Sequence, residues 1–196
     1  MGNFFSKGLQ FMGFLRALPI ILALIGLLAV SNGGGLPDLG KILPTNARND
    51  EKWIRGKVVR VIDGDTLEVR TAWGREKVRM LGIDTPETVR PGVSVECGGP
   101  EASEFMKKLA TGMSVKLVTD PTQDERDRYD RLLAYVEPTG KQWTLQERIL
   151  RAGWATTYVY GRKFRRYQSF SDAEKEARKA GRGVWSACGG DFHRPR

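Results

Sequence analysis

The feature that most constrains this chain is an Asp63-Gly64 pair between two runs rich in β-branched residues. The first run is KVVRVI (residues 57–62), and the second is TLEVRT (residues 66–71). Asp-Gly between such runs predicts a β-hairpin with a tight turn. Apolar and charged residues alternate in the second run, which predicts one buried face. The fold is therefore expected to begin with an antiparallel pair of strands.

Further elements follow at short intervals. Strands are predicted at 77–83, 114–119 and 131–137. Gly99-Pro100 and Gly112 bound a first predicted helix. Capping boxes predict two more helices, one from Thr144-x-x-Glu147 to Gly153 and one from Ser171-x-x-Glu174 to Gly181. The sequence thus predicts an α+β fold, a five-stranded OB-fold β-barrel with about three packed helices.

A hydrophobic segment precedes this domain. Residues 17–30, ALPIILALIGLLAV, are wholly apolar, but as a helix they reach only about 21 Å of a hydrocarbon core about 30 Å thick. We expect residues 1–31 to be a signal peptide or, alternatively, residues 9–30 to anchor the chain in a membrane. In either case the segment engages a membrane or the export machinery, and the domain that follows is secreted or otherwise extracytoplasmic.

The remaining boundaries follow from composition. Residues 32–51 are rich in Gly, Pro and Asn and lack periodicity, which indicates a flexible linker. The folded domain is expected over residues 52–188, with a tail at 189–196.

Charge and rare residues narrow the function. The net charge is +9, and residues 141–196 carry 13 basic but only five acidic side chains. This excess fits a polyanion partner or simply a basic surface. The run RKFRRY (residues 162–167) mixes cations with aromatic residues, as nucleic-acid grooves do, although a solvated loop is equally compatible. Because His193 is the only histidine, most histidine-driven chemistry is excluded, and two cysteines exclude a four-cysteine zinc site.

Two acidic residues stand near the ends of neighbouring predicted strands. Asp65 and Asp84 are able to hold a hard cation such as Ca²⁺ if carbonyls and waters complete its shell, but each is also an ordinary turn residue. Arg79 lies in an otherwise apolar strand and needs an anion there. Its guanidinium fits a phosphate, or it pairs with Glu68 or Glu76.

Arg131 opens the last strand with the same capacity for phosphate, unless it is only a surface arginine. Glu87 follows Pro86, which fixes the local backbone. Because histidine is scarce, a glutamate is a natural base to activate water.

The order of these residues resembles that of the staphylococcal (thermonuclease-type) nuclease family. The resemblance spans about residues 57–187, and its most specific block is VRMLGIDTPET (78–88). The other matching segments are VIDGDTL (61–67), GPEAS (99–103), RYDRLLAY (128–135), GWA (153–155), YVY (158–160) and GVW (183–185).

The resemblance implies an OB-fold nuclease that uses one Ca²⁺. The implied metal ligands are Asp65, Asp84 and the backbone carbonyl of Thr85. Glu87 is implied to orient or deprotonate the attacking water, and Arg79 and Arg131 to neutralise the phosphate. The implied substrate-binding residues are Arg128, Tyr129, Tyr158 and Tyr160, although the last two, on one strand face, also fit ordinary packing.

The expected activity is that of an exported, monomeric, calcium-dependent nuclease. It would hydrolyse phosphodiester bonds of DNA and RNA with little sequence specificity and leave 3′-phosphate ends. The alternative is a non-catalytic module of the same family that binds nucleic acid or protein, but such a module would not need the complete acidic and basic set.

The chain departs from the family at three positions. Asp130 stands where the family has glycine, and its carboxylate either pairs with Arg131 or points away. Cys97 and Cys188 also have no counterpart. In an exported protein they are expected to form a disulfide that ties down the tail and contributes about 4–5 kcal/mol; otherwise they are two unpaired thiols.

Overall fold

A computed structural model of the chain describes residues 51–88, 92 and 94–196. The chain divides into two units, Met1–Ala47 and Arg48–Arg196, and the described residues all belong to the second. The predicted signal peptide or anchor and nearly all of the linker lie outside them. Within the described part, no helix is long and apolar enough to cross a membrane.

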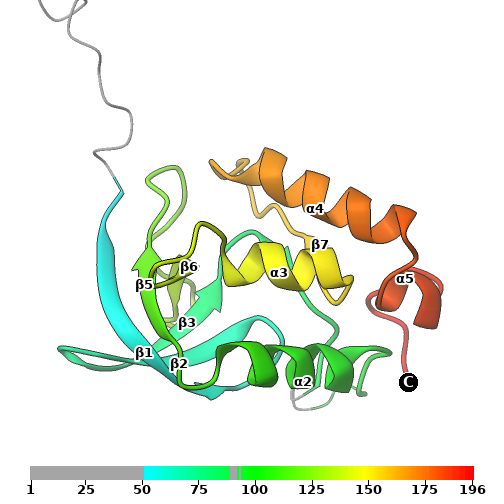
Figure 1. The fold of residues 1–196 in the computed structure, drawn as a ribbon, viewed down its shortest axis with the longest axis horizontal. Helices are drawn as coiled ribbons and strands as arrows, with labels where there is room; N and C mark the ends of the chain where they lie inside the picture. The colour runs from blue at the N-terminus through cyan, green and yellow to red at the C-terminus, as the bar shows by residue number, and fades with distance from the viewer. Residues whose placement is uncertain (1–50, 89–91, 93) are drawn as a thin grey trace, which may run out of the picture. The chain divides into compact units, whose positions relative to one another are not determined.

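Five strands close into a barrel in the order β1-β2-β3-β6-β5 (Figure 1). Neighbours are antiparallel except for β3 and β6, which are parallel. The predicted OB-type architecture is confirmed. The strands are β1 (Trp53–Val61), β2 (Thr66–Thr71), β3 (Gly74–Met80), β5 (Ser114–Val118) and β6 (Leu132–Pro138).

The hairpin of β1 and β2 forms as predicted, but its turn is longer than two residues. β1 ends at Val61 and β2 begins at Thr66, so residues 62–65 make the connection. Gly64 is not in the left-handed region. Instead, a Cβ at this glycine would lie 2.8 Å from Oγ1 of Thr85. The glycine is needed for close approach to a second segment rather than for a tight turn.

The helices pack against the barrel and against one another. In Figure 1 these helices lie to the right of the strands, with α3 between α2 below it and α4 above it; α2 packs against β1 and α3, and α3 packs against β6 and α4. The capping box at Thr144 and the glycine end at Gly153 are confirmed. The helices are α2 (Gly99–Ala110), α3 (Leu145–Ala152), α4 (Tyr167–Lys179) and α5 (Val184–Ala187).

The predicted capping box at Ser171 is wrong, because α4 begins four residues earlier. Phe170 is fully buried within α4 and meets the ring of Phe164 at 5.3 Å. Burial of this ring favours helix on both sides of it. Glu174 does not cap the helix; it accepts hydrogen bonds from Thr156 and Thr157.

A short pair of strands was not expected from the sequence. β4 (Ile83–Asp84) pairs antiparallel with β7 (Thr156–Thr157). Two-residue strands carry no periodicity that a sequence pattern reveals. This pair holds Asp84 beside the barrel, next to the segment that follows α3.

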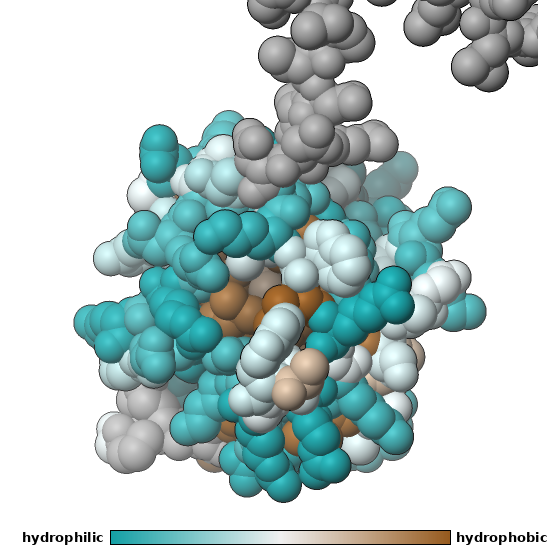
Figure 2. All heavy atoms as spheres, turned by 90° about the vertical axis from the view of Figure 1, so that its left-hand side faces the viewer, coloured by the Kyte–Doolittle hydropathy of each residue, from teal (hydrophilic) through white to brown (hydrophobic). Residues whose placement is uncertain are grey.

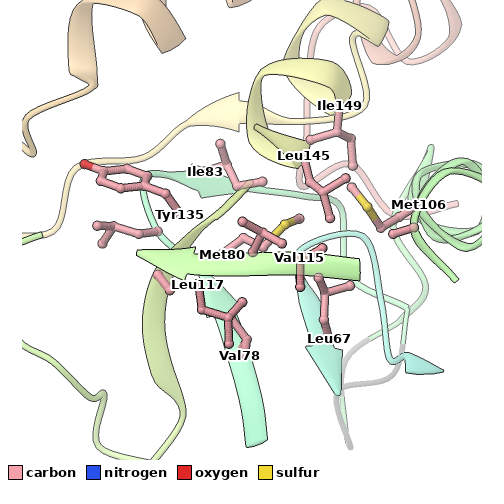
Figure 3. Packing of buried hydrophobic residues seen from close by; sticks show 14 of the residues in the cluster. Leu67, Val78, Met80, Ile83, Met106, Val115, Leu117, Tyr135, Leu145 and Ile149 are labelled. Carbon is pink, nitrogen blue, oxygen red and sulfur yellow. The ribbon is translucent and has the colours of Figure 1, made fainter. Parts of the chain in front are cut away.

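The core joins the barrel to its helices. Figure 3 shows side chains of α2 and α3 directed toward those of the strands. Val115 and Leu117 are 1% exposed and the other labelled residues are fully buried, which makes the barrel a rigid support for its loops. The labelled residues are Leu67, Val78, Met80, Ile83, Met106, Val115, Leu117, Tyr135, Leu145 and Ile149.

Hydrophilic side chains dominate the surface on the side of β1. Figure 2 shows that they surround a small hollow in which hydrophobic side chains are visible. This distribution agrees with the 28% of charged residues in the sequence.

Candidate active site

A pocket of about 1370 Å³ brings together all ten site residues expected from the sequence. They come from the 62–65 connection, β3, β4 and the segment after it, and the loops before β6 and after β7. These ten residues are Asp65, Arg79, Asp84, Thr85, Glu87, Arg128, Tyr129, Arg131, Tyr158 and Tyr160.

Arg79 lies at the centre of this set. Its Nη2 is 3.1 Å from Oδ2 of Asp65 and 2.8 Å from Oδ1 of Asp84. Its Nη1 donates to the carbonyls of Met80 and Ile83. The end of β3 is thereby tied to β4, and the two carboxylates converge on one guanidinium.

The alternative pairings of Arg79 do not occur. Glu68 pairs with Arg60 and Arg75, and Glu76 pairs with Arg126. Arg79 faces the pocket because it stands opposite Thr66 in the β2–β3 register, next to the connection.

Asp65 is buried and fixed by hydrogen bonds. Its Oδ2 accepts from the amide and the hydroxyl of Thr85, at 3.2 and 3.1 Å. Its Oδ1 accepts from the Thr66 hydroxyl, and its amide donates to Asp63. Because Gly64 has no side chain, the 62–65 connection lies close enough to Thr85 for these hydrogen bonds.

Negative charge accumulates at this end of the pocket. Burial and the nearby Asp65 carboxylate raise the pKa of Asp63 to about 7, and the same two causes raise the pKa of Asp84. Burial would lower the pKa of Arg79, but Asp65 and Asp84 more than offset this and raise it. A second cation would relieve the repulsion between these carboxylates.

The oxygen donors at this end of the pocket are of the kind that Ca²⁺ takes. Asp65 and Asp84 supply the hard carboxylate oxygens that Ca²⁺ prefers. Across residues 51–88, 92 and 94–196, no three His, Cys, Asp or Glu side chains form a metal-binding group. A two-carboxylate site fits Ca²⁺ only with backbone carbonyls and waters as its other ligands, which is the arrangement that the sequence predicted.

Arg131 is oriented by Asp127, which sequence reasoning had missed. Nε of Arg131 donates to Oδ2 of Asp127 at 2.7 Å, and its amide donates to Oδ1 at 3.0 Å. Asp130 points away instead: its side chain is 88% exposed and lies 3.6 Å from Nε of Arg126. Its φ of 61° is left-handed, a conformation that glycine adopts more readily than aspartate.

The aromatic residues of the pocket are open to solvent. Tyr129, Tyr158 and Tyr160 are 64%, 47% and 77% exposed. The packing interpretation of the last two is therefore wrong, and so is their common strand face, because β7 ends at Thr157. Arg128 lies over the ring of Tyr129 and donates to its hydroxyl.

The basic run at 162–167 has mixed roles. Arg162 lines the pocket, whereas Phe164 is part of the core. Arg166 pairs with Glu137 at 2.6 Å and lies over the ring of Tyr135. The run is neither a uniform groove nor a simple solvated loop.

Cys97 and Cys188 form the predicted disulfide. The chain beyond it returns to the pocket, where His193 becomes one of the lining residues. Nε2 of His193 lies 3.8 Å from Oδ2 of Asp84. The sequence analysis gave His193 no part in the site, although the expected cysteine pairing already tied the tail to the domain.

The protein is of the OB-barrel class, with a pocket that combines carboxylates and arginines. Comparison with known sequences identifies its family. Residues 77–187 match the family described as staphylococcal nuclease homologue. The chain belongs to this family, which confirms the resemblance.

Named relatives agree. The thermonuclease of Staphylococcus hyicus is 40% identical over 130 residues, which are 66% of this chain and 75% of the relative. Endonuclease YncB of Bacillus subtilis (strain 168) is 37% identical over 145 residues, 74% of this chain and 67% of the relative. The thermonuclease of Staphylococcus intermedius is 36% identical over 135 residues, 67% and 78% of the two chains.

Proposed function

We propose that this protein is a calcium-dependent nuclease that hydrolyses phosphodiester bonds of DNA and RNA with little sequence specificity and leaves 3′-phosphate ends. The observation that carries the proposal is the convergence of Asp65, Asp84 and Arg79 in one pocket with Glu87 and Arg131. Membership of the family and the names of its relatives support it.

Asp65, Asp84 and the Thr85 carbonyl would hold the Ca²⁺. When bound, the ion would polarise a phosphate oxygen and neutralise charge on it. The protein's own contribution is a fixed pair of carboxylates: Asp65 is held by Thr85 and Thr66, and Asp84 is held in β4. Such prior positioning limits the reorganisation needed on binding.

Two arginines would bind the scissile phosphate. Nε of Arg131 donates to Asp127, and Nη1 donates to Thr66. Nη2 makes no hydrogen bond to the described residues. Asp127 therefore orients the guanidinium, and Nη2 can still donate to a phosphate oxygen. Arg79 is more strongly engaged, so a phosphate would compete with Asp65 and Asp84 for its guanidinium.

Glu87 would orient the attacking water and accept its proton. Its carboxylate is half-buried in the pocket wall, and Oε1 accepts from the amide of Thr88 at 3.0 Å. A general base must be held within hydrogen-bond reach of the water, and this local contact restricts where the carboxylate can lie.

Tyr129, Tyr158 and Tyr160 would contact the bound nucleotide. Arg128, which lies beside Tyr129, would contact the sugar-phosphate backbone of the nucleic acid. An exposed aromatic face stacks any base, which agrees with low sequence specificity. The protein would act on either DNA or RNA, because a stacking surface does not select between the two sugars. It would do so as a monomer.

We further propose that the domain acts outside the cytoplasm. The apolar residues 17–30 and the Cys97–Cys188 disulfide support this, because disulfides persist in oxidising compartments. The segment would be a cleaved signal peptide, or residues 9–30 would anchor the domain to a membrane. N-terminal sequencing of the protein recovered from culture medium and from membranes distinguishes the two.

The activity is tested with Glu87→Gln and Arg79→Ala. Each is expected to lower kcat on single-stranded DNA by at least about a hundredfold while changing substrate binding far less. Glu104→Gln, which alters a carboxylate on the exposed side of α2, is the control. Full activity in either site variant would refute the assigned roles, and analysis of the product ends tests the 3′-phosphate.

A further inference from the structure

Glu96 is a buried carboxylate that lines the pocket beside Glu87. Its residue is only 9% exposed, and a buried carboxylate is costly unless hydrogen bonds satisfy it. Oε2 accepts the amide of Glu87 at 2.6 Å, and Oε1 lies 3.3 Å from Nδ1 of His193. Both oxygens are therefore used, one by Glu87 and the other by His193.

Glu87 depends on Glu96 for both of its backbone groups. Besides donating its amide to the Glu96 carboxylate, Glu87 accepts the Glu96 amide at its own carbonyl, at 2.9 Å. The backbone that carries the proposed base is thus fixed by one residue nine positions away in the chain. A shift of about 1 Å in such a group is enough to lower a rate about a hundredfold.

Glu96 is in turn held by the last residues of the chain, 191–196, which we term the tail strap. Glu96 and Pro195 form an antiparallel β-bridge. The amide of Cys97 donates to the carbonyl of Arg194 at 2.7 Å, and the amide of Arg196 donates to the carbonyl of Val95 at 2.9 Å. The strap therefore pairs with the chain on both sides of Glu96.

Two anchors fix the strap to the domain. The Cys97–Cys188 disulfide joins the residue next to Glu96 to the end of α5. Phe192 is buried and meets the ring of Trp185 at 5.1 Å. These anchors place His193 between Glu96 and Asp84.

We infer that Glu96 is a positioning residue for Glu87, and that the disulfide-anchored tail strap holds Glu96 in place through His193 and the β-bridge at Pro195. This inference rests on the proposed function, because it assigns Glu87 a part in the reaction. It extends the site to a segment that lies more than 90 residues away in the sequence.

The test uses four variants of the full chain. Glu96→Ala removes the acceptor for the Glu87 amide, whereas Glu96→Gln keeps an oxygen that can accept it. His193→Ala removes the contact from the strap, and a chain ending at Gly190 lacks the strap. Glu104→Gln, on the exposed side of α2, is the matched control.

For each variant, kcat and KM on single-stranded DNA are measured together with amide hydrogen exchange at Glu87. Glu96→Ala is expected to lower kcat at least tenfold with KM within about twofold, and to accelerate exchange of the Glu87 amide. Glu96→Gln is expected to restore kcat to within about threefold of the wild type. Loss of the strap is expected to lie between these two, with His193→Ala closer to the wild type.

The outcomes separate this inference from the nuclease activity. Wild-type kcat in both Glu96→Ala and the strapless chain overturns the inference, and so does equal impairment of Glu96→Ala and Glu96→Gln. If the wild type itself cleaves no nucleic acid, the proposed function fails, and exchange at Glu87 still decides. Unchanged exchange in Glu96→Ala and in the strapless chain then overturns the inference, whereas faster exchange in both supports the hold on Glu87.

Discussion

Nε of Arg131 lies 2.7 Å from Oδ2 of Asp127, and this ion pair is the contact that directs Arg131 into the pocket. Hydrogen bonds from the amides of Arg131 and Tyr129 to Oδ1 fix the carboxylate itself. Burial would raise the pKa of Asp127, but these hydrogen bonds and the Arg131 charge lower it. Asp127 is therefore ionised in the folded protein near neutral pH.

Asp127→Asn is expected to lower kcat about 10- to 100-fold, the range typical of partners that orient a functional side chain. The amide oxygen can still accept both backbone amides, so the loop is kept while the pair with Nε is lost. Steady-state kinetics and a thermal melt check this. Asp130→Gly is the matched control on the same loop, because its side chain faces away and its φ suits glycine; it should keep full activity. Equal kinetics of Asp127→Asn and the wild type would remove Asp127 from the account.

Gly64→Ala is expected to weaken Ca²⁺ binding at least tenfold, because the added Cβ would lie 2.8 Å from the Thr85 side chain and displace Thr85 from Asp65. Calorimetric titration with Ca²⁺ measures the change. Gly140→Ala is the control: it has a left-handed φ of 76° and open space, so it costs about 1 kcal/mol of stability without touching the site. Equal Ca²⁺ affinity in the two variants would argue against the role of this contact.

Arg162 and Arg166 are expected to respond differently to salt. Arg162 lines the pocket, so Arg162→Ala should weaken binding of single-stranded DNA and reduce the slope of log K against log salt by about one. Arg166 is occupied by Glu137 and Tyr135, so Arg166→Ala should lower the melting temperature and leave the slope unchanged. Fluorescence titrations at several salt concentrations distinguish these results. An unchanged slope for Arg162→Ala would show that Arg162 does not contact the nucleic acid.

Asp120 should make stability depend on pH in the acid range. Burial would raise its pKa, but hydrogen bonds from Tyr135, Arg165 and Thr122 outweigh burial and lower it. Because the folded pKa is below the unfolded one, the stabilisation is complete above about pH 4, the ordinary range of an aspartate, and is lost as pH falls through the folded pKa.

Asp120→Asn is accordingly expected to lower the free energy of unfolding by about 1–3 kcal/mol at pH 7, and by less at pH 3. Urea unfolding at pH 7, 5 and 3 measures this difference. Asp172→Asn, at an exposed carboxylate on α4, should change stability much less. A loss for Asp120→Asn that is the same at pH 3 and pH 7 would contradict the assignment.

The barrel and the main site residues were predictable because each left a local pattern. The alternation in β2 and the capping box at Thr144 are set by neighbours in the chain. Arg79 stood out because an arginine in an apolar strand needs a partner. The family motif then placed it with Asp65 and Asp84.

What the sequence did not reveal depends on contacts between distant segments. β4 and β7 have two residues each, and Gly64 is required by Thr85, 21 positions away. α4 begins early because its Phe170 reaches the core. His193 reaches the pocket only because of the fold of the last residues, which no periodicity encodes.

The central claim is that two carboxylates and two arginines in one pocket make a metal-dependent nuclease. The most direct test is digestion of single-stranded DNA by the purified full chain with Ca²⁺, with excess chelator, and after Ca²⁺ is restored. The account predicts cleavage that the chelator abolishes and Ca²⁺ restores, and that Arg79→Ala lacks under all three conditions. A folded protein that binds DNA but does not cleave it with Ca²⁺, or cleaves it equally in chelator, would contradict the account.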